Sequence, residues 1–248
     1  RQMCIRDRLS ALVVKASFYI LLRLWLDVFP IDSVLLPQFL GVLGAAAILW
    51  GGVQALRQTR LKMLIAYSTV SQLGYLFLAF PLGANIAWKG AMYLLISHAL
   101  AKAAMFMAAG NILHFGGHDR ITELDRLAQR LPLTLAAFSM AGVSIMGLPP
   151  SGGFVGKWLL LDASLSAGKW WWAVIMILGS LLAAAYVFKV IGHAFVHEKV
   201  KRVSSDVPRL MEWTVFVLAL SVILLGFIAP WVLPLMDIGM PFNMGAAR

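Results

Sequence analysis

The stretch MGLPPSGGFVGKW, residues 146–158, decides how this chain folds. It separates two strongly apolar segments, and the residues that interrupt them are Gly147, Pro149, Pro150, Gly152 and Gly153. Proline removes a backbone donor and clashes with the preceding turn. Such an opened backbone is tolerated at membrane depth only where it is buried in protein or lines a water-filled cavity. The stretch therefore predicts a discontinuous helix, broken at Gly147–Gly153, inside a membrane protein.

Composition places the whole chain in the membrane class. Hydrophobic residues make up 61% and charged residues 13%, and the mean hydropathy is +0.84. Soluble domains have about 45–50% apolar and about 25% charged residues. We therefore predict an all-α, polytopic membrane helix bundle. The single cysteine, Cys4, excludes an internal disulfide framework.

Apolar runs long enough to cross a bilayer, about 20 residues each, predict seven transmembrane helices. One of them, at 131–168, is the discontinuous helix, since it is too long for a single straight span. The seven are expected at residues 9–26, 34–56, 62–81, 86–115, 131–168, 170–196 and 211–235.

Lysine and arginine are distributed unevenly between the loops. They concentrate in the N-terminus and in loops 57–62, 116–130 and 197–209, whereas the other side has little beyond Lys89, Lys169 and Arg248. The positive-inside rule makes the first set cytoplasmic and places the C-terminus outside. The net charge of +10 is thus explained by topology, and no nucleic-acid partner is expected.

One of these loops has a helical pattern of its own. Ile121, Leu124 and Leu127 lie at helical spacing opposite charged residues, which predicts a short surface helix that ends near Pro132. An ordinary solvated connector is the alternative.

His98 and Lys102 are the clearest functional candidates. They lie four residues apart on one helix face, about 6 Å along the axis, among apolar neighbours. A charge near the bilayer centre is costly, so such residues are expected to face a polar interior. Linked by water, they could relay protons. The alternative is a packing histidine, and no metal site is expected because no second histidine, cysteine or carboxylate lies within two turns.

Two further lysines are candidates for the same relay. Lys15 lies about a third of the way into the first span. In the alternative interpretation its charged end reaches the membrane interface along the aliphatic stem. Arg23 is expected to be an interfacial anchor of that kind. Lys62 precedes a polar stretch that suggests a wetted face; its alternative is a cytoplasmic anchor. The candidate water-lining residues are Tyr67, Ser68, Ser71 and Ser97.

Lys157 follows the break in the first turns of the second half-helix. The N-terminus of a helix carries partial positive charge, which disfavours a protonated amine nearby. Lys157 is therefore expected to take up and release a proton. The alternative is a proline kink beside a lysine that reaches the interface.

Three motifs in this order resemble a known family: RQTRLKMLIAYSTVSQLGY, SHALAKAAMFMAAGNI and GLPPSGGFVGKWLLL. The chain is similar to the antiporter-like, proton-translocating subunits of respiratory complex I (NADH:quinone oxidoreductase), Mrp-type Na⁺/H⁺ antiporters and membrane-bound hydrogenases. That resemblance implies a fold of fourteen helices built from two inverted five-helix repeats, an arrangement that many transporters use.

The resemblance also implies roles for residues and segments. The first helix here matches the family's eighth, so residues 9–235 would be a proton-conducting domain with the second repeat complete, followed by a tail at 236–248. Lys15 would bridge the two half-channels, and Lys62, His98 and Lys102 would form the second one. Lys157 would release protons outward. Residues 1–8 match no family segment, and the first seven helices, with the family's coupling glutamate and lysine, are expected to be missing.

Three functions stay open at this point. The first is a proton-translocating subunit of a complex I-like assembly, the second a large subunit of an Mrp-type antiporter, and the third a structural membrane scaffold. No cofactor is expected, because the sequence lacks a Rossmann glycine pattern and a cysteine cluster; oxidoreductase activity would belong to the complex. The expected partners are other membrane subunits and the lipid bilayer, and the expected ions are protons and, as a further ion, Na⁺. The expected location is the inner cell membrane.

Overall fold

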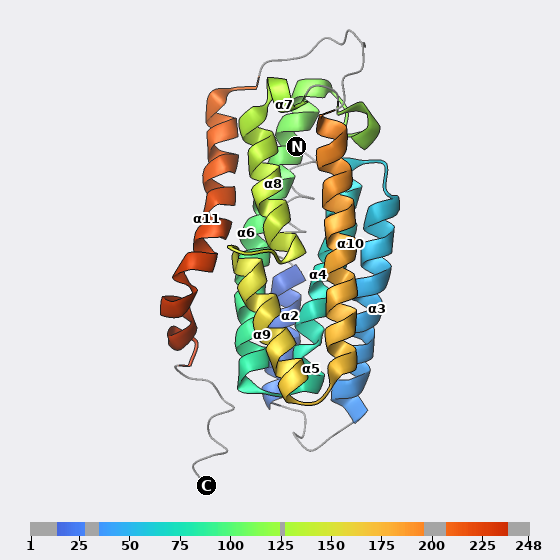
Figure 1. Cartoon of the computed structure of the whole chain (residues 1–248), viewed down its shortest axis with the longest axis vertical. Coiled ribbons are helices and arrows are strands. Elements are labelled where there is room, and N and C mark those ends of the chain that lie inside the picture. Colours follow the sequence, from blue (N-terminus) through green and yellow to red (C-terminus); the bar gives the residue numbers. More distant parts are fainter. Residues whose placement is uncertain (1–13, 28–34, 125–126, 196–206, 238–248) are drawn as a thin grey trace.

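The computed structural model describes residues 14–27, 35–124, 127–195 and 207–237. Within these ranges every regular element is a helix, and the long helices run roughly parallel or antiparallel to one axis (Figure 1). The predicted all-α membrane bundle is thereby confirmed. Five helices are long and apolar enough to cross a membrane, and a shorter apolar helix covers Pro132–Met146.

The helices agree closely with the predicted spans. The first span is described from residue 14 onward, and residues 9–13 lie outside the described part of the chain. Small differences occur in two places: the span at 62–81 ends in a separate turn, α5, and the span at 131–168 is two helices, as expected. The main elements are α2 (Val14–Asp27), α3 (Leu35–Arg57), α4 (Leu61–Phe77), α5 (Ala79–Leu82), α6 (Asn85–Gly116), α8 (Pro132–Met146), α9 (Gly152–Ser166), α10 (Trp170–Ala194) and α11 (Arg209–Leu235).

The break between α8 and α9 lies about halfway along the bundle (Figure 1). Gly147 ends α8 with φ +81°, a left-handed conformation that glycine adopts without steric cost. At the start of α9, an added Cβ on Gly153 would lie 1.9 Å from the carbonyl oxygen of Ser144. The two half-helices are therefore in direct backbone contact, and only glycine fits at that position.

The basic loops at 57–60 and 117–124 meet at one end of the bundle. Leu61 N donates to Asp119 O over 2.7 Å, and Ile121 N donates to Thr59 O over 2.8 Å. The end of α10 and the start of α11 lie at this same end, whereas α5 and the α9–α10 connection lie at the other (Figure 1). The predicted grouping of these loops on one side agrees with this arrangement, although residues 196–206 lie outside the described part.

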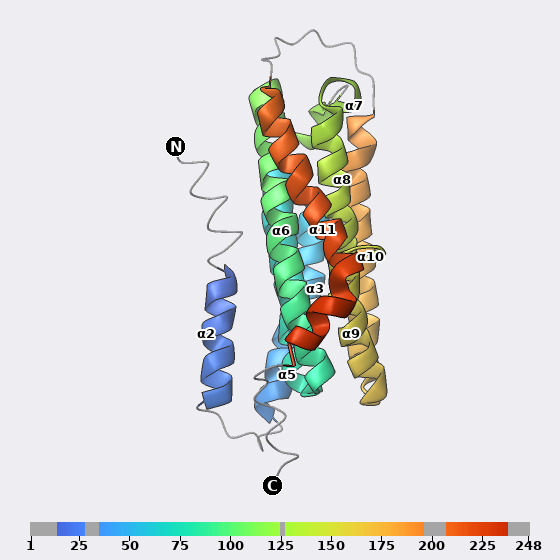
Figure 2. The same ribbon diagram turned by 90° about the vertical axis from the view of Figure 1, so that its left-hand side faces the viewer.

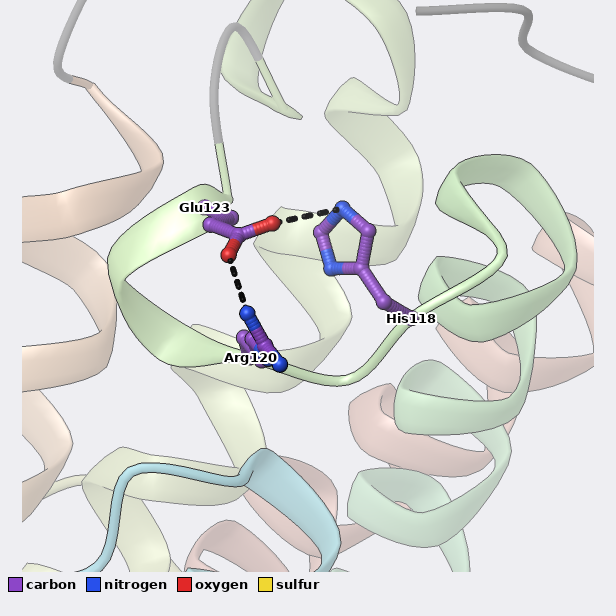
Figure 3. Close-up of polar contacts among 3 residues, drawn as sticks. All are labelled: His118, Arg120 and Glu123. Carbon is purple, nitrogen blue, oxygen red and sulfur yellow. Dashed lines mark hydrogen bonds and ion pairs between the residues drawn. The ribbon is translucent and has the colours of Figure 1, made fainter.

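The helical pattern in the 116–130 loop forms two short elements instead of one surface helix. A 3₁₀ turn covers Ile121–Glu123, and α7 covers Leu127–Arg130. Ile121 is fully buried, because it is held against the other basic loop. Glu123 lies between Arg120, at 3.0 Å, and His118, at 3.6 Å, and the two basic side chains approach its two carboxylate oxygens (Figure 3).

α2 lies beside the half of the bundle that contains α5, and its N-terminal end is near mid-height (Figure 2). Its Phe18 ring packs 5.8 Å from that of Phe77 and 6.2 Å from that of Phe80. Since Lys15 is the second residue of α2, this position brings it to the depth of the break.

Gly153→Ala should disrupt the break. The new methyl group would collide with the Ser144 carbonyl, so α8 and α9 must separate, and we expect loss of assembled protein and a lower melting temperature. The matched control is Gly110→Ala in α6, where an added Cβ meets nothing within 4 Å; helix propensity predicts no loss there. Thermal unfolding of both purified variants tests this, and equal stability would contradict the packing described here.

Candidate functional site: basic groups beside a broken helix

The two ends created by the break are capped by nearby groups. At the end of α8, Leu148 N and Gly147 N both donate to Val143 O over 3.1 Å. At the start of α9, the Ser151 hydroxyl accepts from Phe154 N over 3.2 Å and donates to Leu148 O over 2.6 Å. Two carbonyls of α8, those of Ile145 and Met146, are left for partners from elsewhere, as expected for the last turn of a helix.

Lys157 supplies those partners. Its Nζ donates to Ile145 O over 2.7 Å and to Met146 O over 3.4 Å, and it lies 4.4 Å from the centre of the Tyr75 ring. The sequence placed Lys157 near the positive end of α9; the structure adds the negative end of α8, where cations are favoured. Because the side chain is only 7% exposed, these carbonyls and the aromatic ring substitute for water around the amine.

Lys102 has a similar set of partners on α4. It is fully buried, and its Nζ donates to Ile65 O over 2.8 Å and to the Ser68 hydroxyl. The Ser68 hydroxyl itself donates to Ile65 O over 2.8 Å. Lys102 lies near the middle of α6, so this cluster is at mid-depth, as the sequence predicts.

His98 lies among the three buried lysines. It is 4% exposed, and Lys15, Lys102 and Lys157 all act on it electrostatically. Neither ring nitrogen has a hydrogen-bond partner among the described residues. Buried polar groups of this kind are usually satisfied by ordered water, which fits a hydrated site better than a packing histidine.

The remaining two relay candidates lie on either side of this centre. Lys15 is 6% exposed and interacts electrostatically with Lys102, which agrees with a buried position and not with a lysine that reaches the interface. Lys62 is partly exposed in the first turn of α4. It precedes Ile65 by one turn, about 5 Å along the axis. Lys62 therefore lies on the side of Lys102 that is predicted to face the cytoplasm.

The four predicted water-lining residues have different environments. Ser68 contacts Lys102 as described, and Tyr67 packs against the core. Ser71 donates to Ile48 O of α3 over 3.0 Å, which joins two helices. The Ser97 hydroxyl lies 2.9 Å from that of Ser144. Water contact at these four residues stays a prediction.

Several polar residues near the relay were not selected from the sequence. Ser144 accepts from Gly153 N over 3.1 Å, and Ser180 of α10 lies 3.3 Å from both Lys157 Nζ and the Tyr75 hydroxyl. Gln72, which belongs to the polar stretch that follows Lys62, donates to Ile145 O over 3.2 Å. A single serine in a long apolar helix is too weak a signal for selection, because its partners come from other helices.

A polar cluster and a further lysine, Lys189, lie away from these contacts. Thr134 donates to Glu212 over 3.3 Å and accepts from Asn111 over 3.3 Å, which joins α6, α8 and α11. Lys189 of α10 donates to Leu56 O and Gln58 O over 2.8 Å each. Since these carbonyls end α3, Lys189 caps a helix. Among the described residues, no group of three or more His, Cys, Asp or Glu could hold a metal ion.

Fold and site together define a membrane-spanning helix bundle that holds basic groups at mid-depth beside a broken helix. The family model described as "NADH:quinone oxidoreductase/Mrp antiporter, TM" matches residues 8–183. The chain therefore belongs to this family of transmembrane subunits, and the resemblance drawn from the three motifs is confirmed.

Individual relatives come from more than one branch. The N subunit of NADH-quinone oxidoreductase from Desulforudis audaxviator is 33% identical over 254 residues, which cover 91% of this chain and 51% of that protein. A Na(+)/H(+) antiporter subunit from Bacillus subtilis is 25% identical over 230 residues, covering 92% and 47%. A chain of the Mrp complex from Dietzia sp. DQ12-45-1b shares the fold, with a TM-score of 0.88 at 23% identity over 94% of this chain and 52% of that one.

These coverages bear on what the chain represents. It spans about half the length of the relatives described above. Those relatives are named as subunits or as part of a complex. The apolar helices of this chain make it an integral membrane protein.

Lys189→Met should weaken the bundle. The change removes two donors from the end of α3, which we expect to cost about 1–3 kcal/mol and to lower the melting temperature. Lys89→Met is the control, because Lys89 forms a partly exposed ion pair with Asp237, and such pairs contribute about 0–1 kcal/mol. Equal melting temperatures of the two variants would contradict the role of Lys189 as a cap.

Proposed function

We propose that this chain conducts protons across the membrane as part of a complex I-like NADH:quinone oxidoreductase. The route runs through Lys15, Lys62, His98, Lys102 and Lys157 with intervening water. The observation that carries this proposal is the cluster at mid-depth, where three buried lysines act electrostatically on one buried histidine that has no protein partner within the described residues.

The chemistry of these groups suits proton transfer. Lys102 and Lys157 each have carbonyl acceptors that an ammonium group satisfies, while burial opposes any lasting charge. A lysine under both influences can hold a proton briefly and pass it on. His98 can accept at one ring nitrogen and release from the other, which makes it a suitable link between Lys15 and Lys102.

A second candidate function is cation/proton exchange in an Mrp-type antiporter. It is favoured by the match to the Bacillus subtilis antiporter subunit over 92% of this chain. The higher identity to the N subunit of NADH-quinone oxidoreductase, 33%, favours the complex I-like assembly. In either assembly this chain conducts protons. The redox chemistry or the sodium exchange that is coupled to this conduction resides with other subunits.

A purely structural scaffold explains fewer of the contacts. Contacts such as Ser71 to Ile48 O do join helices, and a scaffold needs polar contacts of this kind. It gives no reason to bury His98 without a protein partner among the described residues or to collect three lysines around it. We assign residues 9–235 to the conducting domain and residues 236–248 to a tail, and we place residues 1–8 outside the conducting domain.

Lys102→Met and Lys157→Met should each abolish proton transport. Methionine keeps much of the side-chain volume but cannot carry a proton, so a relay is interrupted at that point. The measurement is proton uptake into vesicles that contain the protein assembled with its partner subunits, with Lys89→Met as the matched control. Normal uptake by both lysine variants would refute the relay and leave the scaffold function.

We propose that the protein lies in the inner cell membrane. In the proposed orientation its C-terminus is outside, and the cytoplasmic loops are 57–62, 116–130 and 197–209. In a variant without Cys4, a cysteine in place of exposed Gln129 should react with impermeant thiol reagents only from the cytoplasmic side. A cysteine in place of exposed Ala167 should react only from the outside. The opposite pattern would invert the topology.

A further inference from the structure

A line of polar side chains on α4 leads from Lys102 to Lys157. Ser68, Gln72 and Tyr75 lie at positions i, i+4 and i+7, which share one helix face, and each is at most 1% exposed. Ser68 contacts Lys102 at one end of this line, and the Tyr75 ring contacts Lys157 at the other. The distance along the helix axis from Ser68 to Tyr75 is about 10 Å.

Gln72 occupies the middle of this line and is already tied to the Lys157 end. Its side-chain nitrogen donates to Ile145 O over 3.2 Å, the same carbonyl that accepts from Lys157 Nζ over 2.7 Å. An amide side chain that donates through nitrogen can accept through its oxygen at the same time. Because both nitrogens donate to the same carbonyl, this oxygen holds Gln72 beside Lys157 but passes no proton between them. The gap that a proton must cross lies between Ser68 and Lys157, along Gln72.

Tyr186 of α10 lies opposite the part of α4 between Ser68 and Gln72. Its side chain is fully buried, and its hydroxyl interacts with the side chains of Ser68 and Gln72 without forming a direct hydrogen bond to any described residue. A buried hydroxyl without a partner costs about 1–3 kcal/mol. Ordered water commonly satisfies such a group when two or more polar neighbours are in reach.

The antiparallel packing of α4 and α10 explains why Tyr186 meets Ser68. At the other end of the line, Ser180 of α10 lies 3.3 Å from the Tyr75 hydroxyl. Six residues separate Ser180 from Tyr186, about 9 Å along the axis, which closely matches the spacing from Tyr75 to Ser68. The polar side chains of the two helices therefore meet in pairs, one pair beside each lysine.

From this geometry we propose that the Tyr186 hydroxyl receives the proton from Ser68, directly or through one water, and passes it to water beside Gln72 that leads to Ser180 and Lys157. This proposal rests on the proposed proton conduction. It assigns Tyr186 as a relay residue, which neither the motifs nor the family resemblance identified.

The proton balance of this step is simple. The Lys102 ammonium gives up one proton and becomes a neutral amine, and each hydroxyl or water along the way accepts a proton on a lone pair while releasing its own to the next acceptor. Water beside Gln72 carries the proton on to the Ser180 hydroxyl, which lies 3.3 Å from Lys157 Nζ. This hydroxyl gives its own proton to the Lys157 amine, and the ammonium so formed donates to Ile145 O. Tyr186 ends the step with its hydroxyl restored, and its orientation is reversed.

Tyr186→Phe tests this proposal by removing a single oxygen atom from the full protein in its membrane complex. We expect proton uptake into vesicles to fall at least tenfold, while the melting temperature stays the same or rises, because the hydroxyl that is removed has no direct partner among the described residues. A purely structural tyrosine would show the reverse, a lower melting temperature with uptake retained.

The matched control is Tyr93→Phe, which removes a hydroxyl that donates to Leu225 O away from α4. It should keep uptake within twofold of the wild type. Uptake by Tyr186→Phe equal to that of this control would overturn the Tyr186 link. If Lys102→Met and Lys157→Met still abolish uptake in that case, the proposed function stands and only the link has failed; normal uptake by all of these variants would refute both.

A density map of the complete complex that resolves water provides a second measurement. Water within hydrogen-bond distance of the Tyr186 hydroxyl and of Ser68 or Gln72, or a direct hydrogen bond between these groups, supports the link. Apolar contact around the hydroxyl, with no water and no hydrogen bond, would overturn it.

Discussion

The contact between Lys157 and the carbonyl oxygen of Ile145 is the interaction on which the rest of the structure depends. A hydrocarbon environment offers no hydrogen-bond partners, so each backbone group opened by the break must find one inside the protein. Gly147 and Leu148 satisfy two carbonyls of α8, those of Val143 and Ser144, and Lys157 satisfies two more. The same contact therefore holds the broken helix together and keeps an ionisable group at mid-depth.

This constraint extends from the break to the neighbouring helices. Gln72 of α4 shares the Ile145 carbonyl with Lys157, and Ser180 of α10 contacts Lys157 as well. Ser97 of α6 reaches the break through Ser144, which in turn accepts from Gly153 N. Because these contacts come from several helices, the break is positioned by the whole bundle, and a change at one contact alters the surroundings of Lys157.

Much of the architecture could be predicted because a membrane restricts the backbone structures that a chain can adopt inside it. Span lengths, the break at 146–153 and the distribution of basic loops all follow from hydropathy, proline, glycine and charge, which are local properties. Lys102 and Lys157 could also be selected locally, since a lysine in an apolar helix stands out. The loop at 116–130 was less predictable: its apolar residues are buried against a second loop, and that contact divides the expected surface helix into two short elements.

By itself, the sequence determined the class of protein, the positions of the long apolar helices, the discontinuous helix and the identity of the buried basic residues. Only the tertiary structure decided which carbonyls each lysine contacts, that Lys189 caps α3 and that Tyr186 faces Ser68 and Gln72. The physical reason is that a hydrogen bond depends on two groups and on how their helices are rotated and aligned. Periodicity shows which residues share a face of one helix, but the pairing of faces between helices arises when all of them pack together.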